Sequence, residues 1–370
     1  MNENEIRVGI THGDINGIGY EVILKTLLDP RITELCTPIV YGSPKVAAYH
    51  RKALKIEAVN MNIINDTTQA LHDRVNMINC VDDAIKVELG KDSDISGESS
   101  FLALDKAVDD LSVNKLDVIV TAPINKFALN QNHPDFLGHT DFLNQKFPNQ
   151  GLMELLVGQN LKIASVAGYL PMYDVSDAIT SENVLSKIRL LNNSLIDDFM
   201  ITRPRIAVLG LNPHSGESGL CGNEEIEAIG PAIENAREEG TMAFGPFSAD
   251  GFFASDEYKK YDAVLAMYYE QASIPFKIIE GLTGVAYTVG LPKVRTAPAH
   301  GVSYGKVGLN KADEQAMRNA IYLAKDIFFN RITSHKISKN PLQKYDITPS
   351  NHTQDLNVED IKGIEKEVED

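Results

Sequence analysis

From Leu209 to Gly222 the chain reads Leu-Gly-Leu-Asn-Pro-His-Ser-Gly-Glu-Ser-Gly-Leu-Cys-Gly. An apolar run at 206–209 leads into this stretch and predicts a buried strand, and the amphipathic residues 223–239 after it predict a helix. The turn holds His214 and three glycines, which let backbone amides approach a ligand closely: Gly216, Gly219 and Gly222. In α/β proteins ligands bind at this edge, beyond the carboxyl ends of the strands. An ordinary glycine-rich connection with a solvated histidine is the alternative on these residues alone.

Strand, polar loop and helix follow one another along most of the chain. Ile6 to Ile10 predicts a strand that enters the polar loop 11–19, and Asp117 to Thr121 predicts a β-branched strand that enters a second polar loop. Further strands are predicted at 38–42, 60–64, 75–80, 154–157, 162–167, 261–268 and 285–290, and helices at 20–28, 45–54, around 101–111, from a Thr140 cap onward, at 174–195 and at 312–330. This alternation predicts an α/β fold with a largely parallel sheet and helices on both faces.

Composition narrows the possible partners. The 370 residues are 43% hydrophobic and 23% charged, which is ordinary globular composition and long enough for two domains. A formal net charge of −16 argues against nucleic acid or an anionic membrane as a partner. The three cysteines, Cys36, Cys80 and Cys221, fit neither a zinc nor a disulfide pattern. With a polar start and no run of transmembrane length, we expect a cytoplasmic protein.

Six motifs in a fixed order resemble one enzyme family. They are Gly13-Asp-Ile-Asn-Gly-Ile-Gly19, Thr121-Ala-Pro-Ile-Asn-Lys126, Gly138-His-Thr140, Asn212-Pro-His-Ser-Gly-Glu217, Gly222-Asn-Glu-Glu225 and Gly290-Leu-Pro-Lys-Val-Arg-Thr296. Together they resemble the 4-hydroxythreonine-4-phosphate dehydrogenases of vitamin B6 synthesis. The resemblance implies an isocitrate/isopropylmalate dehydrogenase-like fold of two α/β domains, residues 1–125 with 305–335 and residues 126–304, with a cleft between them. Residues 337–370 lie outside it, and their composition predicts a mobile acidic tail.

The resemblance also implies a reaction and a substrate site. The reaction is the NAD- or NADP-dependent oxidation of a phosphorylated substrate's secondary alcohol, followed by loss of carbon dioxide from the β-keto acid. The site would lie at the interface of a homodimer. His139 and Thr140 would bind the substrate, and Lys277 and Arg295, which we expect on loops beside strands, would hold its anionic groups.

By the same resemblance His214 would bind a divalent metal ion, with the Asp250 carboxylate nearby. A metal ion there lowers the pKa of the alcohol and stabilises the developing alkoxide. Lys277, Asp250 and His214 would then form the catalytic set. The dinucleotide would lie against a further group of residues, namely Asn212, Gly216, Glu217, His300 and Gly301.

Two departures from the family pattern affect the metal site. The family places three histidines on the metal ion, whereas this chain has Tyr169 and Tyr269 at two of those positions. Because a tyrosine has a pKa near 10, we expect weak Zn²⁺ binding. Asp250 and Glu270 could rebuild an oxygen-rich site with His214 that suits Mg²⁺ or Mn²⁺. Alternatively, the tyrosine hydroxyl groups fill the place of the metal with hydrogen bonds, or the two rings simply pack.

Two further departures concern other parts of the site. Ala286 stands where the family has a substrate-binding asparagine, and Gly305 stands where it has an acid that can hold the adenosine ribose, with Lys306 next to it. The residues therefore fit a working dehydrogenase, and also a diverged paralogue that binds a phosphorylated small molecule with weak or no hydride transfer. A transferase of the same fold has no nucleophile motif in its favour.

The motif residues lead to one specific prediction about the cleft. We expect a phosphate group, on a phosphorylated ligand or alone, between Lys277, Arg295, His139 and Thr140. The alternative is that both cations pair with acidic side chains and leave no room for an anion.

Overall fold

The computed structural model describes residues 6–82, 84–148 and 151–339. Residues up to Ser334 form one compact unit, and the chain from His335 onward belongs to a second. Most of the predicted acidic tail, from residue 340 on, lies outside the described residues. Within the described residues, no helix has the length and apolar character needed to cross a membrane.

Strands and helices alternate along most of the described chain, as the sequence predicts, and the last helix ends beyond the first unit. The strands are β1 (Arg7–Thr11), β2 (Thr37–Gly42), β3 (Met61–Ile64), β4 (Val75–Asn79), β5 (Val118–Thr121), β6 (Met153–Val157), β7 (Lys162–Ser165), β8 (Arg205–Leu209), β9 (Met242–Phe247), β10 (Ala263–Ala266), β11 (Val285–Val289) and β12 (Val294–Pro298). The α-helices are α1 (Gly19–Leu27), α2 (Arg31–Leu35), α3 (Pro44–Leu54), α4 (Asp94–Ser112), α5 (Lys126–Asn130), α6 (His139–Lys146), α7 (Met172–Ala178), α8 (Ser181–Asp197), α9 (Gly230–Glu238), α10 (Ala249–Ala254), α11 (Tyr269–Glu280) and α12 (Gln315–Ser338).

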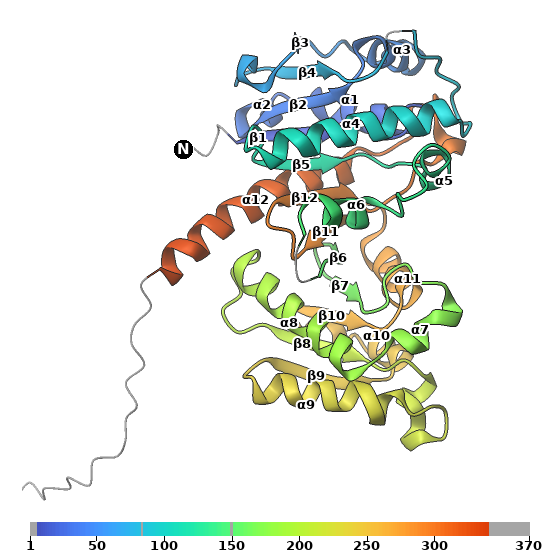
Figure 1. Ribbon diagram of the computed structural model, residues 1–370, viewed down its shortest axis with the longest axis vertical. Coiled ribbons are helices and arrows are strands. Elements are labelled where there is room, and N and C mark those ends of the chain that lie inside the picture. The colour runs from blue at the N-terminus through green and yellow to red at the C-terminus, as the bar shows by residue number, and fades with distance from the viewer. Residues whose placement is uncertain (1–5, 83, 149–150, 340–370) are drawn as a thin grey trace, which may run out of the picture. The chain divides into compact units, whose positions relative to one another are not determined.

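The twelve strands form one sheet in the order β3-β4-β2-β1-β5-β12-β11-β6-β7-β10-β8-β9. The pairings at both ends of this order are parallel, and the described antiparallel pairings lie in the middle, between β12 and β11, β11 and β6, and β6 and β7. In Figure 1, α4 runs along β1 and β5, and α9 covers β9 at the other end. The predicted α/β fold with a largely parallel sheet is confirmed. The division into two domains stays a prediction.

Helix α12 is longer than the sequence predicts. It continues to Ser338 instead of ending near Asn330. Five apolar residues at helical spacing, Ala316, Ala320, Ile321, Ala324 and Ile327, are all buried and form a stripe on one face of the helix. The first part of the predicted tail is therefore helical.

Candidate functional site

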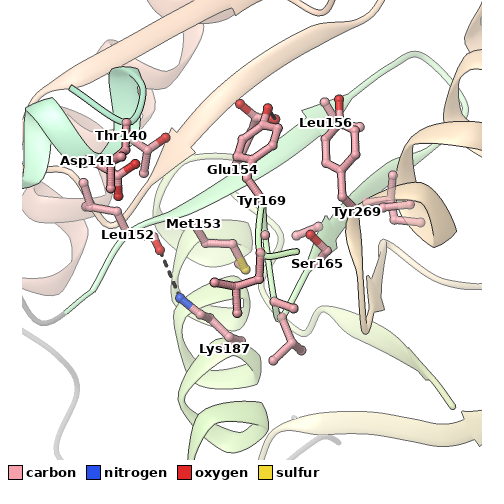
Figure 2. A pocket seen from close by; sticks show the side chains of 18 of the residues that line it. Thr140, Asp141, Leu152, Met153, Glu154, Leu156, Ser165, Tyr169, Lys187 and Tyr269 are labelled. Atoms are coloured by element: carbon pink, nitrogen blue, oxygen red, sulfur yellow. Dashed lines mark hydrogen bonds between the residues drawn. The ribbon is translucent and has the colours of Figure 1, made fainter. Parts of the chain in front are cut away.

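A pocket of about 510 Å³ opens beside strands β6 and β7. Its walls come from five elements, α6, β6, β7, α8 and α11, and from the segment after β7. Thr140, Tyr169 and Tyr269 are among the lining residues, so three positions that the sequence singles out meet in one cavity. Figure 2 shows both phenol rings in this pocket with their hydroxyl groups pointing the same way, beside the Glu154 carboxylate.

Arg295 is a buried cation in the sheet. It lies in the middle of β12, not on a loop as predicted, and only 3% of the residue is exposed. Its Nε and Nη2 atoms donate to Thr121 Oγ1 at 3.0 and 2.7 Å, and Nη1 donates to Thr288 Oγ1 at 3.3 Å. No carboxylate of the described residues lies within ion-pair distance of it. Burial lowers the pKa of Arg295, and the charge of Glu154 opposes that shift.

His139 begins helix α6 next to this arginine. Its Nε2 atom is buried and has no hydrogen-bond partner among the described residues. Burial, together with the charges of Arg295 and Lys126, keeps the pKa of His139 well below its ordinary value. Gly138 is the N-cap of α6, with a φ of 155° and no side-chain cap. The prediction that Thr140 caps this helix is wrong, because Thr140 lies within the first turn.

Lys126 is a second cation of this site that the sequence reasoning did not single out. It follows β5 and begins α5, and its Nζ atom lies 3.8 Å from the centroid of the Tyr169 ring. Burial lowers the pKa of Lys126, whereas the charges of Glu154 and Asp141 raise it. The signal was present as the last residue of the motif Thr121–Lys126. We call Lys126, His139 and Arg295 the basic cluster.

The structure places Lys277 in a different environment from the loop that the sequence predicts. It is an exposed residue of helix α11, not of a loop. Its role in holding the substrate therefore stays a prediction.

The rings of Tyr169 and Tyr269 pack against each other at two positions where the family has metal-binding histidines. Their ring centroids are 4.8 Å apart with the planes inclined by 34°, and the Tyr169 hydroxyl donates to Glu154 Oε1 at 2.8 Å. Burial and the Glu154 charge raise the pKa of Tyr169, and burial raises that of Tyr269. A phenol that holds its proton this firmly is a poor metal ligand at neutral pH.

The remaining metal candidates do not compensate for these tyrosines. His214 is exposed in the turn Pro213–Gly219, where it and its four successors through Ser218 have positive φ angles. The charge of His214 helps to lower the pKa of Asp250, after hydrogen bonds to that carboxylate from Ser248 and Gly251. Among the described residues no group of three or more His, Cys, Asp and Glu side chains is arranged to hold a metal ion. The donors present therefore do not fit the family's three-histidine site.

Two segments carry the predicted dinucleotide contacts. In the first, Asn212 is held by two carboxylates, since its Nδ2 atom donates to Glu224 at 2.7 Å and to Glu225 at 3.0 Å. Gly216 of the same turn is buried, and Glu217 is exposed.

In the second segment, the His300 Nδ1 atom donates to the Gly301 carbonyl, and its buried Nε2 atom has no partner among the described residues. Tyr304 is anchored by a 2.6 Å hydrogen bond to Asp14, and Asn125 donates to its hydroxyl at 2.9 Å. The sequence reasoning missed this anchor. The roles of these residues in binding a dinucleotide stay predictions.

Comparisons with known proteins agree with this arrangement. A model of the family described as "Pyridoxal phosphate biosynthetic protein PdxA" matches residues 34–324. The chain is 46% identical over 346 residues to the 4-hydroxythreonine-4-phosphate dehydrogenase of Bacteroides thetaiotaomicron, covering 93% of this chain and 94% of that protein. It is 36% identical to the protein of the same name from a Sulfurihydrogenibium species, covering 86% of this chain and 97% of that one.

Solved structures with a similar fold include proteins of the same name. A crystal structure of 4-hydroxythreonine-4-phosphate dehydrogenase from Klebsiella pneumoniae is similar with a TM-score of 0.75 and 28% identity, covering 89% of this chain and 99% of that one. Sequence and fold therefore agree over most of the chain, and the basic cluster lies within the matched residues. On both grounds, the chain belongs to the PdxA family of pyridoxal phosphate biosynthetic proteins.

Proposed function

We propose that the protein is a 4-hydroxythreonine-4-phosphate dehydrogenase of pyridoxal phosphate synthesis. It would oxidise the secondary alcohol of 4-phosphohydroxy-L-threonine with NAD or NADP, and the β-keto acid formed would lose carbon dioxide. Family membership and the names of the similar proteins support the reaction. A cytoplasmic location belongs to the same proposal.

The observation that carries this proposal is the buried Arg295, which has no carboxylate partner among the described residues. A buried charge is costly unless it is paired, and the two threonine hydroxyls that accept from Arg295 carry no charge. The charges of Arg295 and Lys126 both lower the pKa of His139. The buried Nε2 atom of His139 has no hydrogen-bond partner among the described residues. An anionic substrate group would supply the missing negative charge, and a guanidinium can hold such a group with two parallel hydrogen bonds. The alternative that acidic side chains already pair with Arg295 is wrong for the described residues.

The other residues of the site receive their roles by family resemblance. Thr140 and Lys277 would contact the substrate together with the basic cluster, and His214 and Asp250 would lie near the reacting carbon. NAD or NADP would lie against His300 and Gly301, and against the turn that holds Asn212, Gly216 and Glu217. When bound, it accepts the hydride. The chain's own residues bind and orient the substrate.

A homodimer is part of the same proposal. Three apolar side chains are exposed beside the pocket, Leu170 in its lining and Met172 and Tyr173 at the start of α7. Contiguous exposed apolar surface of this kind is typical of protein interfaces. A partner that covers this segment would also close the pocket from solvent.

The second candidate function is a paralogue that binds the phosphorylated ligand without oxidising it. Tyr169 and Tyr269 at the metal positions favour it, because an alcohol without a metal ion needs another way to lose its proton. Reduction of NAD or NADP in the presence of substrate distinguishes the dehydrogenase from the paralogue.

Calorimetric titration with 4-phosphohydroxythreonine, followed by assays of NAD and NADP reduction, tests the proposal. We expect binding by the wild type, a rise of the dissociation constant by about 100-fold in Arg295→Ala, and by about 10-fold in Lys126→Met, since hydrogen bonds to charged groups contribute about 1.5–3 kcal/mol. Lys336→Met, a change at an exposed lysine of α12, is the control. Binding unchanged by Arg295→Ala contradicts the anion site, and binding without reduction of either dinucleotide favours the paralogue.

A further inference from the structure

The charge of the Glu154 carboxylate acts on both tyrosines and on two cations of the basic cluster, Lys126 and Arg295. Glu154 is a residue of β6 and lines the pocket. In the antiparallel pairing of β6 with β11, Glu154 is directly opposite Thr288, whose hydroxyl accepts from Arg295. Directly opposite side chains point to the same face of a sheet. The carboxylate that accepts from Tyr169 therefore faces the same side as the arginine's threonine partner.

Oxidation of an alcohol requires a group that takes the hydroxyl proton. In a metal-dependent dehydrogenase the metal ion lowers the pKa of the alcohol, but the donors among the described residues do not fit such an ion. Two carboxylates line the pocket among the described residues, Asp141 and Glu154. Asp141 lies in the first turn of α6, where its charge is stabilised by the helix N-terminus. The Glu154 carboxylate accepts a hydrogen bond from the Tyr169 hydroxyl, which orients it.

We propose that Glu154 is the general base for the substrate hydroxyl, oriented by Tyr169, and that Tyr169 and Tyr269 make the site independent of a metal ion. The inference rests on the proposed dehydrogenase function. The Tyr169 hydroxyl keeps its proton and donates a hydrogen bond to one carboxylate oxygen, Oε1. The other oxygen is left to accept from the substrate. A general base must lie within hydrogen-bond reach of the proton that it removes.

The proton and electron changes balance within this site. The hydroxyl proton moves to Glu154, the carbinol carbon becomes a carbonyl, and its hydride reduces the bound NAD or NADP. The β-keto acid then breaks the bond to its carboxylate and releases carbon dioxide. The electron pair left on carbon takes the proton from Glu154, which is ionised again for the next cycle.

Steady-state kinetics on chelator-treated protein test the inference. We expect the wild type to keep its activity without added metal. In Glu154→Gln we expect kcat to fall by about 100-fold or more, the usual contribution of a positioned base, while calorimetry shows the dissociation constant of 4-phosphohydroxythreonine within about 3-fold of wild type. Tyr169→Phe should lower kcat by about 10-fold with little change in KM, because the base is present but poorly oriented.

Matched controls separate these effects from general damage. Glu234→Gln, at an exposed position of α9, and Tyr49→Phe, at an exposed position of α3, should behave like wild type. The double variant Tyr169→His with Tyr269→His should gain Zn²⁺ affinity by titration with the metal alone.

The outcomes distinguish this inference from the proposed function. Wild-type turnover that disappears on chelation and returns with Zn²⁺ overturns the inference and leaves the dehydrogenase assignment standing. A Glu154→Gln variant that keeps kcat within about 3-fold of wild type overturns the inference in the same way. No turnover by wild type, with or without metal, removes the dehydrogenase assignment and this inference together.

Discussion

Two histidines enclose a tyrosine in the core near the first polar loop. The Tyr20 ring stacks on His12 at 5.3 Å and on His50 at 5.2 Å between centroids. Each histidine donates through Nε2 to a backbone carbonyl, His12 to Ser99 at 3.1 Å and His50 to Ile15 at 2.7 Å. A carbonyl can only accept, so these contacts fix the neutral tautomer of both rings. Burial lowers the pKa of each to about 4.

These histidines should make the fold sensitive to acid. Both pKa values lie below the ordinary 6.5, so their contribution to stability is fully present above pH 6.5 and is lost as the pH falls toward 4. At about 1.4 kcal/mol per pKa unit, protonation of each histidine can lower the free energy of unfolding by up to about 3 kcal/mol. Urea unfolding at pH 7, 5 and 4 measures this loss.

The control for this experiment is His335→Asn, at an exposed position, and the test variant is His50→Gln. His50→Gln should show a flatter pH profile than both wild type and the control. Equal pH profiles for all three proteins would contradict the assignment of acid sensitivity to these rings.

At the residue scale, the sequence predicted which residues belong to the site better than it predicted where they lie in the fold. Arg295 and His139 lie together as expected, because both belong to motifs recognisable without a structure. The sequence missed Lys126 and Glu154, since their importance comes from contacts with Tyr169 and not from a local pattern. It could not show that Arg295 lies inside the sheet.

Helix α12 is tied to the sheet and to α8 by one buried polar group. Asp198, the C-cap of α8, accepts from Arg331 Nε, from the Tyr287 hydroxyl and from Ser194 Oγ, each at 2.6 Å. Arg331 also donates to the Tyr287 hydroxyl at 2.7 Å and to the Leu291 carbonyl at 2.9 Å. The network joins α12, α8 and β11.

Removing the cation should destabilise the whole unit. Arg331→Met leaves the buried Asp198 charge without its ion-pair partner, a change that costs about 3–5 kcal/mol in comparable cases. Chemical denaturation measures the difference, and Lys336→Met on the same helix should stay within about 0.5 kcal/mol of wild type. If both variants unfold alike, Arg331 does not anchor the helix.

At the element scale, the sequence failed where local signals conflicted with tertiary context. Strand β12 contains Arg295 and ends at Pro298, and neither residue is typical of a central strand. It forms because β5 and β11 pair with it on either side. Helix α11 continues through an internal proline, Pro275, a residue that usually ends a helix, and it includes Lys277, which we expected on a loop. Strong alternation made most of the other strands predictable, whereas strand β9 and the short helices α2 and α10 were missed.

At the scale of the whole molecule, we expect a dimer in solution. Tyr173 is 82% exposed in the apolar segment after β7. Light scattering at micromolar concentration should give twice the monomer mass of 40.7 kDa. Tyr173→Asp should shift the protein toward monomer because it buries a charge at the interface, and Tyr49→Phe should not. A monomeric wild type would contradict the dimer, and a dimeric Tyr173→Asp would place the interface elsewhere.

The sheet order has a consequence for synthesis on the ribosome. Strand β5 pairs on one side with β1, which is made first, and on the other side with β12, which begins only at Val294. At roughly 5–20 residues per second, translation needs on the order of ten seconds or more to reach that strand. Throughout that interval the nascent chain carries an open edge of apolar residues, of the kind that pairs with other chains. The yield of folded protein should therefore depend on the pace of translation as well as on the stability of the finished sheet.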